Sequence, residues 1–293
     1  MRNIIILSDF FSEDFKAPAH PGGAELNDKV LFDHLEQQGI VKAKIRTKDF
    51  SKEDMLSFLK RNINCIFLIS NFYHLPFACT VFLMENCKYF IYEHDYKFHK
   101  FRNPIRYKNF IVPKNEIVNY NFFHKAQEVI CLSKLHYNIF KDNMKIQNLY
   151  NTTCSLWPDE ILNHIEKVCE TKKNGKVAII NSPNPIKRRD DCIAFARSKN
   201  LDYDLISSPN PIDFLSVLAQ YEKVIILAGH PEPTPRIAVE AKMLNCKLLS
   251  NPKTIGVSYE EWFSLNGKEL IQKIKEIREH TLNYITKRLK NEI

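Results

Sequence analysis

The segment from His230 to Asn245, HPEPTPRIAVEAKMLN, decides how the rest of the chain is interpreted. It follows the apolar run VIILAG and leads through prolines into a stretch rich in Ala, Met and Leu. This succession predicts a buried strand, a tight loop and then a helix. In an open parallel sheet, ligands bind beyond the carboxyl ends of the strands, where such loops enter helices.

Two carboxylates, Glu232 and Glu240, stand in this segment, one at the mouth of the loop and one inside the helix. The first N–H groups of a helix have no intrahelical partner and carry the positive end of its dipole, which suits a phosphate. A carboxylate at the loop can meet a polar ligand, and one further along can accept hydrogen bonds from a diol such as ribose. The pattern fits a sugar-nucleotide site, but it also fits two surface glutamates.

Composition narrows the class of protein. With 293 residues, 44% of them hydrophobic and 26% charged, the chain has room for one large or two medium soluble domains. The seven glycines form neither a G-x-G-x-x-G fingerprint nor a P-loop, which argues against a dinucleotide dehydrogenase and a P-loop NTPase. The eight cysteines include no C-x-x-C pair, so we expect reduced core thiols in a cytoplasmic protein and no zinc site.

The net charge of +8 favours an anionic partner: a sugar nucleotide, a lipid phosphate, a membrane surface or a nucleic acid. Charge alone does not choose among these. No apolar run approaches the roughly 18 residues of a membrane helix, and the first residues resemble a strand more than a secretion signal. Abundant Lys, Asn, Ile and Phe beside scarce Gly suggest an AT-rich genome, bacterial or viral.

Strand and helix patterns alternate along the whole chain. In the first half, the apolar runs predict strands at 3–7, 42–46, 65–69, 89–93 and 129–132, with helices ending near Gln38 and at 52–61, 77–86 and 134–140. After a weakly patterned link at 151–176, strands are expected at 177–180, 203–206, 223–227 and 247–250, with helices at 189–198, 211–219 and 268–290.

The two runs of alternating strands and helices, one before and one after the link, predict an α/β protein of two Rossmann-like lobes. Each lobe is expected to be a parallel sheet flanked by helices, with a cleft between the lobes. The predicted domains are 1–150 and 151–293, and the second domain carries the closing helix.

The alternation breaks down between Tyr96 and Lys125. This stretch holds seven Lys or Arg and one acid, Glu116, with aromatic residues interleaved. It predicts an acceptor-binding or membrane-facing surface, a stacking platform for nucleic acid, or an ordinary packing segment. We expect mostly buried aromatics and an acceptor groove lined by basic residues; the candidates on this side are Asp95, Lys97, Lys100 and Arg102.

Four features, in order along the chain, resemble the retaining glycosyltransferases of the large group 1 family (family 4), which have the two-domain GT-B fold. Glu232 and Glu240 match the Glu-x7-Glu signature of that family. The others are Gly22-Gly23-Ala24-Glu25 after the first strand, His94-Asp95 after the fourth, and the basic run Pro185-Ile186-Lys187-Arg188-Arg189.

The resemblance implies a metal-independent retaining glycosyltransferase that moves a sugar from a nucleoside-diphosphate sugar, of UDP or GDP type, to a glycan, lipid or nucleic-acid acceptor. No cofactor beyond this donor is implied. Glu240 would hold the ribose, Glu232 and His94 would be the catalytic residues that meet the sugar, and the implied donor-binding residues are Gly22, Gly23, Lys187, Arg188, Thr234 and Arg236.

The chain departs from the family in two places. Relatives have Gly-rich residues between the two acids, whereas this chain has Pro233-Thr234-Pro235-Arg236, and Pro235 has no N–H to give to a phosphate. The Thr234 hydroxyl and the Arg236 guanidinium are the expected substitutes. A family Arg is also missing near Asn181 unless Arg188 or Arg189 replaces it.

The basic run raises an electrostatic question. Three cations at a helix start oppose the helix dipole, so we expect an anion beside them. Two alternatives to the enzyme remain: a non-catalytic sugar-nucleotide or glycan-binding protein on a degenerate GT-B fold, and a nucleic-acid-modifying transferase. A peripheral membrane contact and a virus-encoded origin are also compatible with the sequence.

Overall fold

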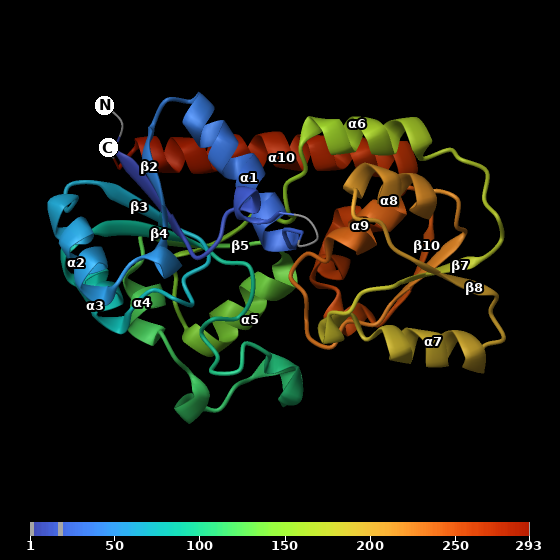
Figure 1. Cartoon of the computed structure of the whole chain (residues 1–293). Helices are drawn as coiled ribbons and strands as arrows, with labels where there is room; N and C mark the ends of the chain where they lie inside the picture. The colour runs from blue at the N-terminus through green and yellow to red at the C-terminus, as the bar shows by residue number, and fades with distance from the viewer. Residues whose placement is uncertain (1–2, 17–19, 293) are drawn as a thin grey trace. The chain divides into compact units, whose positions relative to one another are not determined.

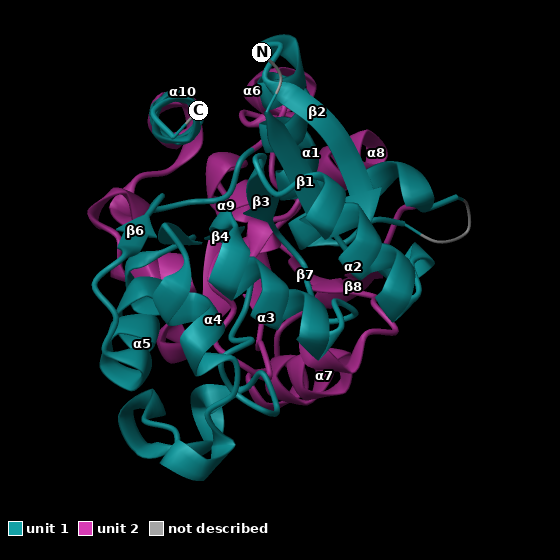
Figure 2. Cartoon of the chain, turned by 90° about the vertical axis from the view of Figure 1, so that its left-hand side faces the viewer, with its two compact units in different colours: residues 1–156, 279–293 teal, residues 157–278 magenta. Residues whose placement is uncertain are grey.

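The computed structural model describes residues 3–16 and 20–292, in two compact units (Figures 1 and 2). Unit 1 comprises Met1–Leu156 and Glu279–Ile293, and unit 2 comprises Trp157–Arg278. The division follows Leu156, whereas the sequence placed it after residue 150. The closing helix is shared, because its residues from Glu279 onward belong to unit 1.

Unit 1 contains a six-stranded parallel sheet in the order β2-β1-β3-β4-β5-β6. Its strands are β1 (Ile4–Ser8), β2 (Val41–Arg46), β3 (Ile66–Ile69), β4 (Lys88–Tyr92), β5 (Glu128–Cys131) and β6 (Leu149–Asn151). Its helices are α1 (Gly23–Gln37), α2 (Lys52–Arg61), α3 (Phe77–Asn86), α4 (Tyr120–Lys125) and α5 (Lys134–Met144), joined by the end of α10 (Gly267–Lys290).

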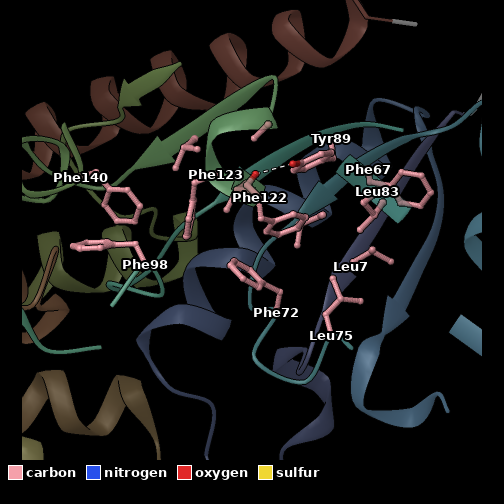
Figure 3. Packing of buried hydrophobic residues seen from close by; sticks show 14 of the residues in the cluster. Leu7, Phe67, Phe72, Leu75, Leu83, Tyr89, Phe98, Phe122, Phe123 and Phe140 are labelled. Atoms are coloured by element: carbon pink, nitrogen blue, oxygen red, sulfur yellow. Dashed lines mark hydrogen bonds between the residues drawn. The ribbon is translucent and has the colours of Figure 1, made fainter. Parts of the chain in front are cut away.

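Alternating strand residues divide the core of unit 1 between the two faces of its sheet. Ile4 and Ile6 pack with α1 and the end of α10, whereas Ile5 and Leu7 pack with α2 to α5. Figure 3 shows the second face, where Tyr89 stacks on Phe122 and its hydroxyl donates a hydrogen bond to the Phe122 carbonyl, 2.6 Å away. The aromatic residues therefore form much of this core.

The stretch from Tyr96 to Lys125 folds as short 3-10 turns followed by α4. Tyr96, Phe98, Phe122 and Phe123 are buried, as expected for core aromatics, while Phe101 and Tyr120 are 52% and 43% exposed. The segment is therefore partly core and partly surface.

Unit 2 contains a four-stranded parallel sheet in the order β10-β9-β7-β8. Its strands are β7 (Val177–Ile180), β8 (Tyr203–Ile206), β9 (Lys223–Ile226) and β10 (Lys247–Ser250), and its helices are α6 (Asp159–Val168), α7 (Arg189–Ser198), α8 (Pro211–Leu218), α9 (Arg236–Met243) and the first part of α10. Val177, Ile179 and Ile225 pack against α7 on one face.

The predicted α/β class, with two parallel sheets flanked by helices, is confirmed. The prediction of a weakly patterned link at 151–176 is wrong, because α6 lies there with Leu162 and Ile165 buried. Strand β6 was also missed; it has only three residues, all half-buried, and so shows no long apolar run.

Candidate functional site

The strand order of unit 2 creates a reversal point between β7 and β9. The chain leaves β7 for β8 on one side and then crosses to β9 on the other. In sheets of this type, ligands bind where the connections diverge, beyond the carboxyl ends of the two strands. The loops at this point carry Lys187 and Glu232, and the Gly229 N–H joins the loops by donating to the Ile186 carbonyl, 3.1 Å away.

Lys187 and Glu232 form an ion pair across this point. The Lys187 Nζ lies 3.0 Å from Oε1 and 2.8 Å from Oε2 of Glu232. The carboxylate side chain is 14% exposed and the lysine side chain 32%. The structure thus brings together two residues that lie far apart in the sequence and that the resemblance assigned to the same ligand.

The backbone of Glu232 is fixed by the segment that follows β10. Its N–H donates to the Thr254 carbonyl at 3.0 Å, and its carbonyl accepts from the Gly256 N–H at 2.8 Å. These bonds form an isolated parallel bridge between Glu232 and Ile255. The position of the acid therefore depends on a loop outside the sequence motif.

Glu240 lies on α9 in contact with Trp157 and Arg236. The indole Nε1–H of the fully buried Trp157 donates to Glu240 Oε1 at 2.9 Å. The Arg236 guanidinium stands over the same indole, 4.4 Å from the ring centroid, and its Nε lies 3.7 Å from Glu240 Oε1. Arg236 therefore helps to hold the carboxylate and is stacked on an aromatic ring.

The anion expected beside the basic run comes from the chain itself. Arg188 Nε pairs with Asp191 at 2.6 Å, and Arg189 Nε pairs with Asp190 at 3.0 Å. Both acids lie in the first turn of α7, where negative charge is favourable. These two acids balance the charge of Arg188 and Arg189, so the basic run does not require a bound anion. A ligand that binds Arg188 would have to compete with Asp191.

Pro235 occupies the position just before α9 and Thr234 is half-buried beside it. The start of α9 therefore lacks one backbone donor, as the sequence predicted.

In unit 1, His94 follows β4 and meets two polar side chains. Its Nε2 lies 2.7 Å from Asp28 Oδ1 and 3.1 Å from Ser70 Oγ. Ser70 also donates to Asp28. Burial alone would lower the pKa of His94, but the charge of Asp28 and its hydrogen bond raise it above the usual value. The cluster lies at the carboxyl edge of the sheet, at the position predicted for His94.

Next to it lies a buried ionic network. Lys97 is 4% exposed and its Nζ lies 3.0 Å from Glu93 Oε1 and 3.1 Å from Asp95 Oδ1. Arg102 pairs with the same Asp95. Burial raises the pKa of Glu93 to about 8, while the pKa of Asp95 is lowered because the neighbouring Lys97 and Arg102 charges outweigh its burial. Lys97 is consequently occupied inside the fold and does not line a surface groove.

Lys100, in contrast, is exposed, and its Nζ stands 5.6 Å from the Phe101 ring centroid.

Gly22 and Gly23 lie at the start of α1 and are exposed. A Cβ added to Gly22 would lie 2.8 Å from Glu25 Oε2, so the carboxylate of Glu25 folds over this turn. A phosphate at the start of α1 would have to displace it.

The contributors to these clusters that were not predicted include Trp157, Asp28 and Ser70. Trp157 precedes α6, which the sequence interpretation treated as a link. Asp28 lies within α1, where an acid gives no sign of burial. Only Trp157 had an available signal, since tryptophan is rare in this chain and amphipathic helix spacing follows it.

Within residues 3–16 and 20–292, no group of three or more His, Cys, Asp or Glu is placed to hold a metal ion. No helix in those same ranges has the length and apolar character needed to cross a membrane.

The two sheets, with their helices and strand orders, define the GT-B fold of glycosyltransferases. Sucrose-phosphate synthase from Thermosynechococcus elongatus is similar over 99% of each chain, with a TM-score of 0.64 and 9% identity. HepE from Anabaena, solved in complex with UDP and glucose, is similar over 97% of this chain and 100% of its own, with a TM-score of 0.56 and 12% identity.

A UDP-forming α,α-trehalose-phosphate synthase from Burkholderia xenovorans is similar over 100% of this chain and 98% of its own, with a TM-score of 0.51 and 9% identity. No family model matches the sequence, and no curated protein matches it. At these identities the likeness establishes the fold, and the chemistry must be argued from the side chains.

Proposed function

We propose that the chain is a glycosyltransferase that uses a nucleoside-diphosphate sugar, with unit 2 as the donor-binding unit. The observation that carries this proposal is the Lys187–Glu232 pair at the reversal point between β7 and β9. A cation and a carboxylate at this point suit the two halves of such a donor, because the diphosphate needs positive charge and the sugar hydroxyls need acceptors.

The proposed donor contacts follow from the geometry of unit 2. Lys187 leaves Glu232 and neutralises the diphosphate, and the released Glu232 carboxylate accepts hydrogen bonds from the sugar. Glu240 accepts from the ribose hydroxyls, with Oε1 held by Trp157 and Oε2 available for the ligand. Arg236 is assigned to orienting Glu240, because its guanidinium stacks on Trp157.

The reaction is proposed to break the bond between the anomeric carbon and the diphosphate oxygen, and to form one to an acceptor hydroxyl oxygen with retention of configuration. The proton of that hydroxyl passes to the leaving diphosphate. Lys187 would offset the charge of the leaving diphosphate without a metal. HepE was solved with UDP, which favours uridine as the base. In unit 1, His94 is proposed as a contact for a sugar hydroxyl, and the exposed Lys100 as an acceptor-side contact.

Release of UDP from UDP-glucose tests this function. The purified chain should release UDP, and Glu232→Gln should slow release roughly 100-fold, the scale of losing one charge-stabilising group in an active site. Glu222→Gln is the matched control, because that glutamate is 47% exposed and pairs with Lys223 just before β9. Equal rates in the two variants would argue against the assignment.

A second candidate is a nucleotide-sugar-binding protein without turnover. It is favoured by Pro235 at the start of α9, which removes a phosphate donor, and by the pairing that already satisfies Lys187. This candidate predicts UDP-glucose binding with no UDP release under any acceptor condition. Release above the rate of the Glu232→Gln variant would exclude it.

A further inference from the structure

Unit 2 contains a cavity of about 560 Å³ along the edge strand β10. Its walls come from the end of α9 and the residues after it, from β10 itself, and from the turns that follow β10. The volume lies within the range of roughly 300–1,000 Å³ that small-molecule sites have. None of Lys187, Glu232, Arg236 and Glu240 lines it.

The lining of this cavity is cationic. It includes Lys242 and Lys247 and no acidic residue. Within the described ranges, neither lysine forms an ion pair: no carboxylate oxygen lies within 4 Å of the Lys242 or the Lys247 ammonium. Most other half-buried ammonium groups of the chain, such as that of Lys187, have a carboxylate or carbonyls as partners.

Lys242 is half-buried, and burial lowers its pKa. Its Nζ donates to Asn266 Oδ1 at 2.9 Å and stands 5.0 Å from the Phe263 ring centroid. An ammonium has three donors, so this neutral oxygen satisfies only one of them. A partly desolvated cation without an opposite charge is costly, and an anion in the cavity would remove that cost.

Uncharged polar groups complete the lining. Asn245, Ser250 and Ser258 line the same cavity. The Ser250 hydroxyl and the second Asn245 amide proton can donate to phosphate or hydroxyl oxygens, whereas the Ser258 hydroxyl, which donates to the Pro252 carbonyl at 2.9 Å, can accept from a ligand hydroxyl. Phe263 supplies an apolar surface beside Lys242. This mixture suits a ligand with one anionic end and a polar body.

We propose that this cavity binds a small phosphate monoester, with Lys242 and Lys247 on the phosphate and the polar side chains on the rest of the ligand. The site is separate from the proposed donor site and does not depend on it. The segment from Pro252 to Ser258 contributes its two end residues to the wall of the cavity. The same segment holds the Glu232 backbone through hydrogen bonds of the Thr254 carbonyl and the Gly256 N–H. An occupied cavity should therefore slow hydrogen exchange at the Glu232 and Gly256 amides.

Calorimetric titration with glucose 6-phosphate, with glucose as the neutral control, tests the proposal. We expect binding of the phosphate ester and none of glucose. Lys242→Met should weaken binding roughly 10- to 100-fold, the scale of losing a hydrogen bond to a charged group. Lys253→Met is the matched control, because Lys253 is exposed in the same segment and does not line the cavity. It should bind as the unmodified chain does.

Two further variants keep the test decisive. Lys247→Met changes an exposed position and should also weaken binding, which covers the case of a poorly folded Lys242 variant. Lys187→Met should leave glucose 6-phosphate binding intact, which separates this cavity from the donor site. Absence of binding at millimolar ester, equal binding of glucose, or unchanged affinity in both Lys242→Met and Lys247→Met would overturn the proposal.

Discussion

The Lys187 ammonium lies within 3.0 Å of both carboxylate oxygens of Glu232, although the two residues come from loops after different strands. Without a ligand, the positive charge of Lys187 is neutralised by the carboxylate of Glu232. A diphosphate entering this point competes with Glu232 for Lys187, and this competition frees the carboxylate for the sugar. Binding of the nucleotide and exposure of the acid are therefore linked in the proposed site.

This competition predicts opposite effects of removing the two partners on the affinity for UDP. Lys187→Met should weaken UDP binding about tenfold or more, since a hydrogen bond to a charged group is lost. Glu232→Gln should strengthen UDP binding about two- to fivefold, since a partly exposed ion pair no longer competes. Calorimetric titration measures both. Lys199→Met, at the exposed end of α7, serves as the control, and changes of the same sign in both variants would contradict the linkage.

The contact between Trp157 and Glu240 predicts that the two tryptophans of the chain differ in importance for the nucleotide. Trp157→Phe keeps a ring beneath Arg236 but removes the donor to Glu240, so the affinity for UDP should fall about tenfold. Trp262→Phe is the matched control, because its buried Nε1 has no hydrogen-bond partner. Equal affinities in the two variants would show that Trp157 does not position Glu240.

The buried His136 predicts that stability depends on pH. Its Nε2 donates to the Asp95 carbonyl at 2.6 Å, and its Nδ1 accepts from the Leu132 N–H at 3.2 Å. Burial lowers its pKa to about 3 from 6.5, so the unfolded chain takes up this proton at a pH where the folded chain does not. This contribution to stability is therefore present above pH 6.5 and is lost as the pH falls toward 3, with about 2 kcal/mol lost by pH 5.

Urea unfolding between pH 7 and 5 measures this change in free energy, and NMR titration of the imidazole signals assigns it. His136 should not titrate in that range. A titration of His136 near pH 6 would show that its imidazole is not held neutral.

The aromatic core of unit 1 predicts a large packing effect. Phe122 is 2% exposed and stacks on Tyr89, with ring centroids 4.9 Å apart (Figure 3). Phe122→Ala should lower the free energy of unfolding by about 3–5 kcal/mol, because it leaves a cavity. Phe101→Ala removes a ring that is 52% exposed and should cost under about 1 kcal/mol. Urea denaturation compares the two variants, and similar losses would mean that the stacked core is not formed.

Local patterns were sufficient to predict most of the fold. The bounds of α7, β8 and β10 match the prediction, because each is a short apolar or amphipathic run between turn residues. Helix α6 was missed although Leu162 and Ile165 have helical spacing and acids fill its first turn. Its buried face has only these two residues, and the polar residues around them resemble a linker.

The contacts between site residues were harder to predict than the residues themselves. Lys187 and Glu232 were each singled out, but their pairing depends on β7 lying beside β9, which is set by the order of strands in the sheet. The contact of His94 with Asp28 has the same origin, since those residues are 66 positions apart in the sequence. Such nonlocal neighbours are not encoded in any spacing along the chain.

Nucleotide binding by unit 2 is the central claim, and a denaturation panel with UDP, GDP, ADP and CMP tests it most directly. UDP at about 100 times its dissociation constant should add about 2.7 kcal/mol of stability. Glu240→Gln should remove most of that gain, while Glu222→Gln should retain it. The absence of a response to every nucleotide in the unmodified chain would contradict the account.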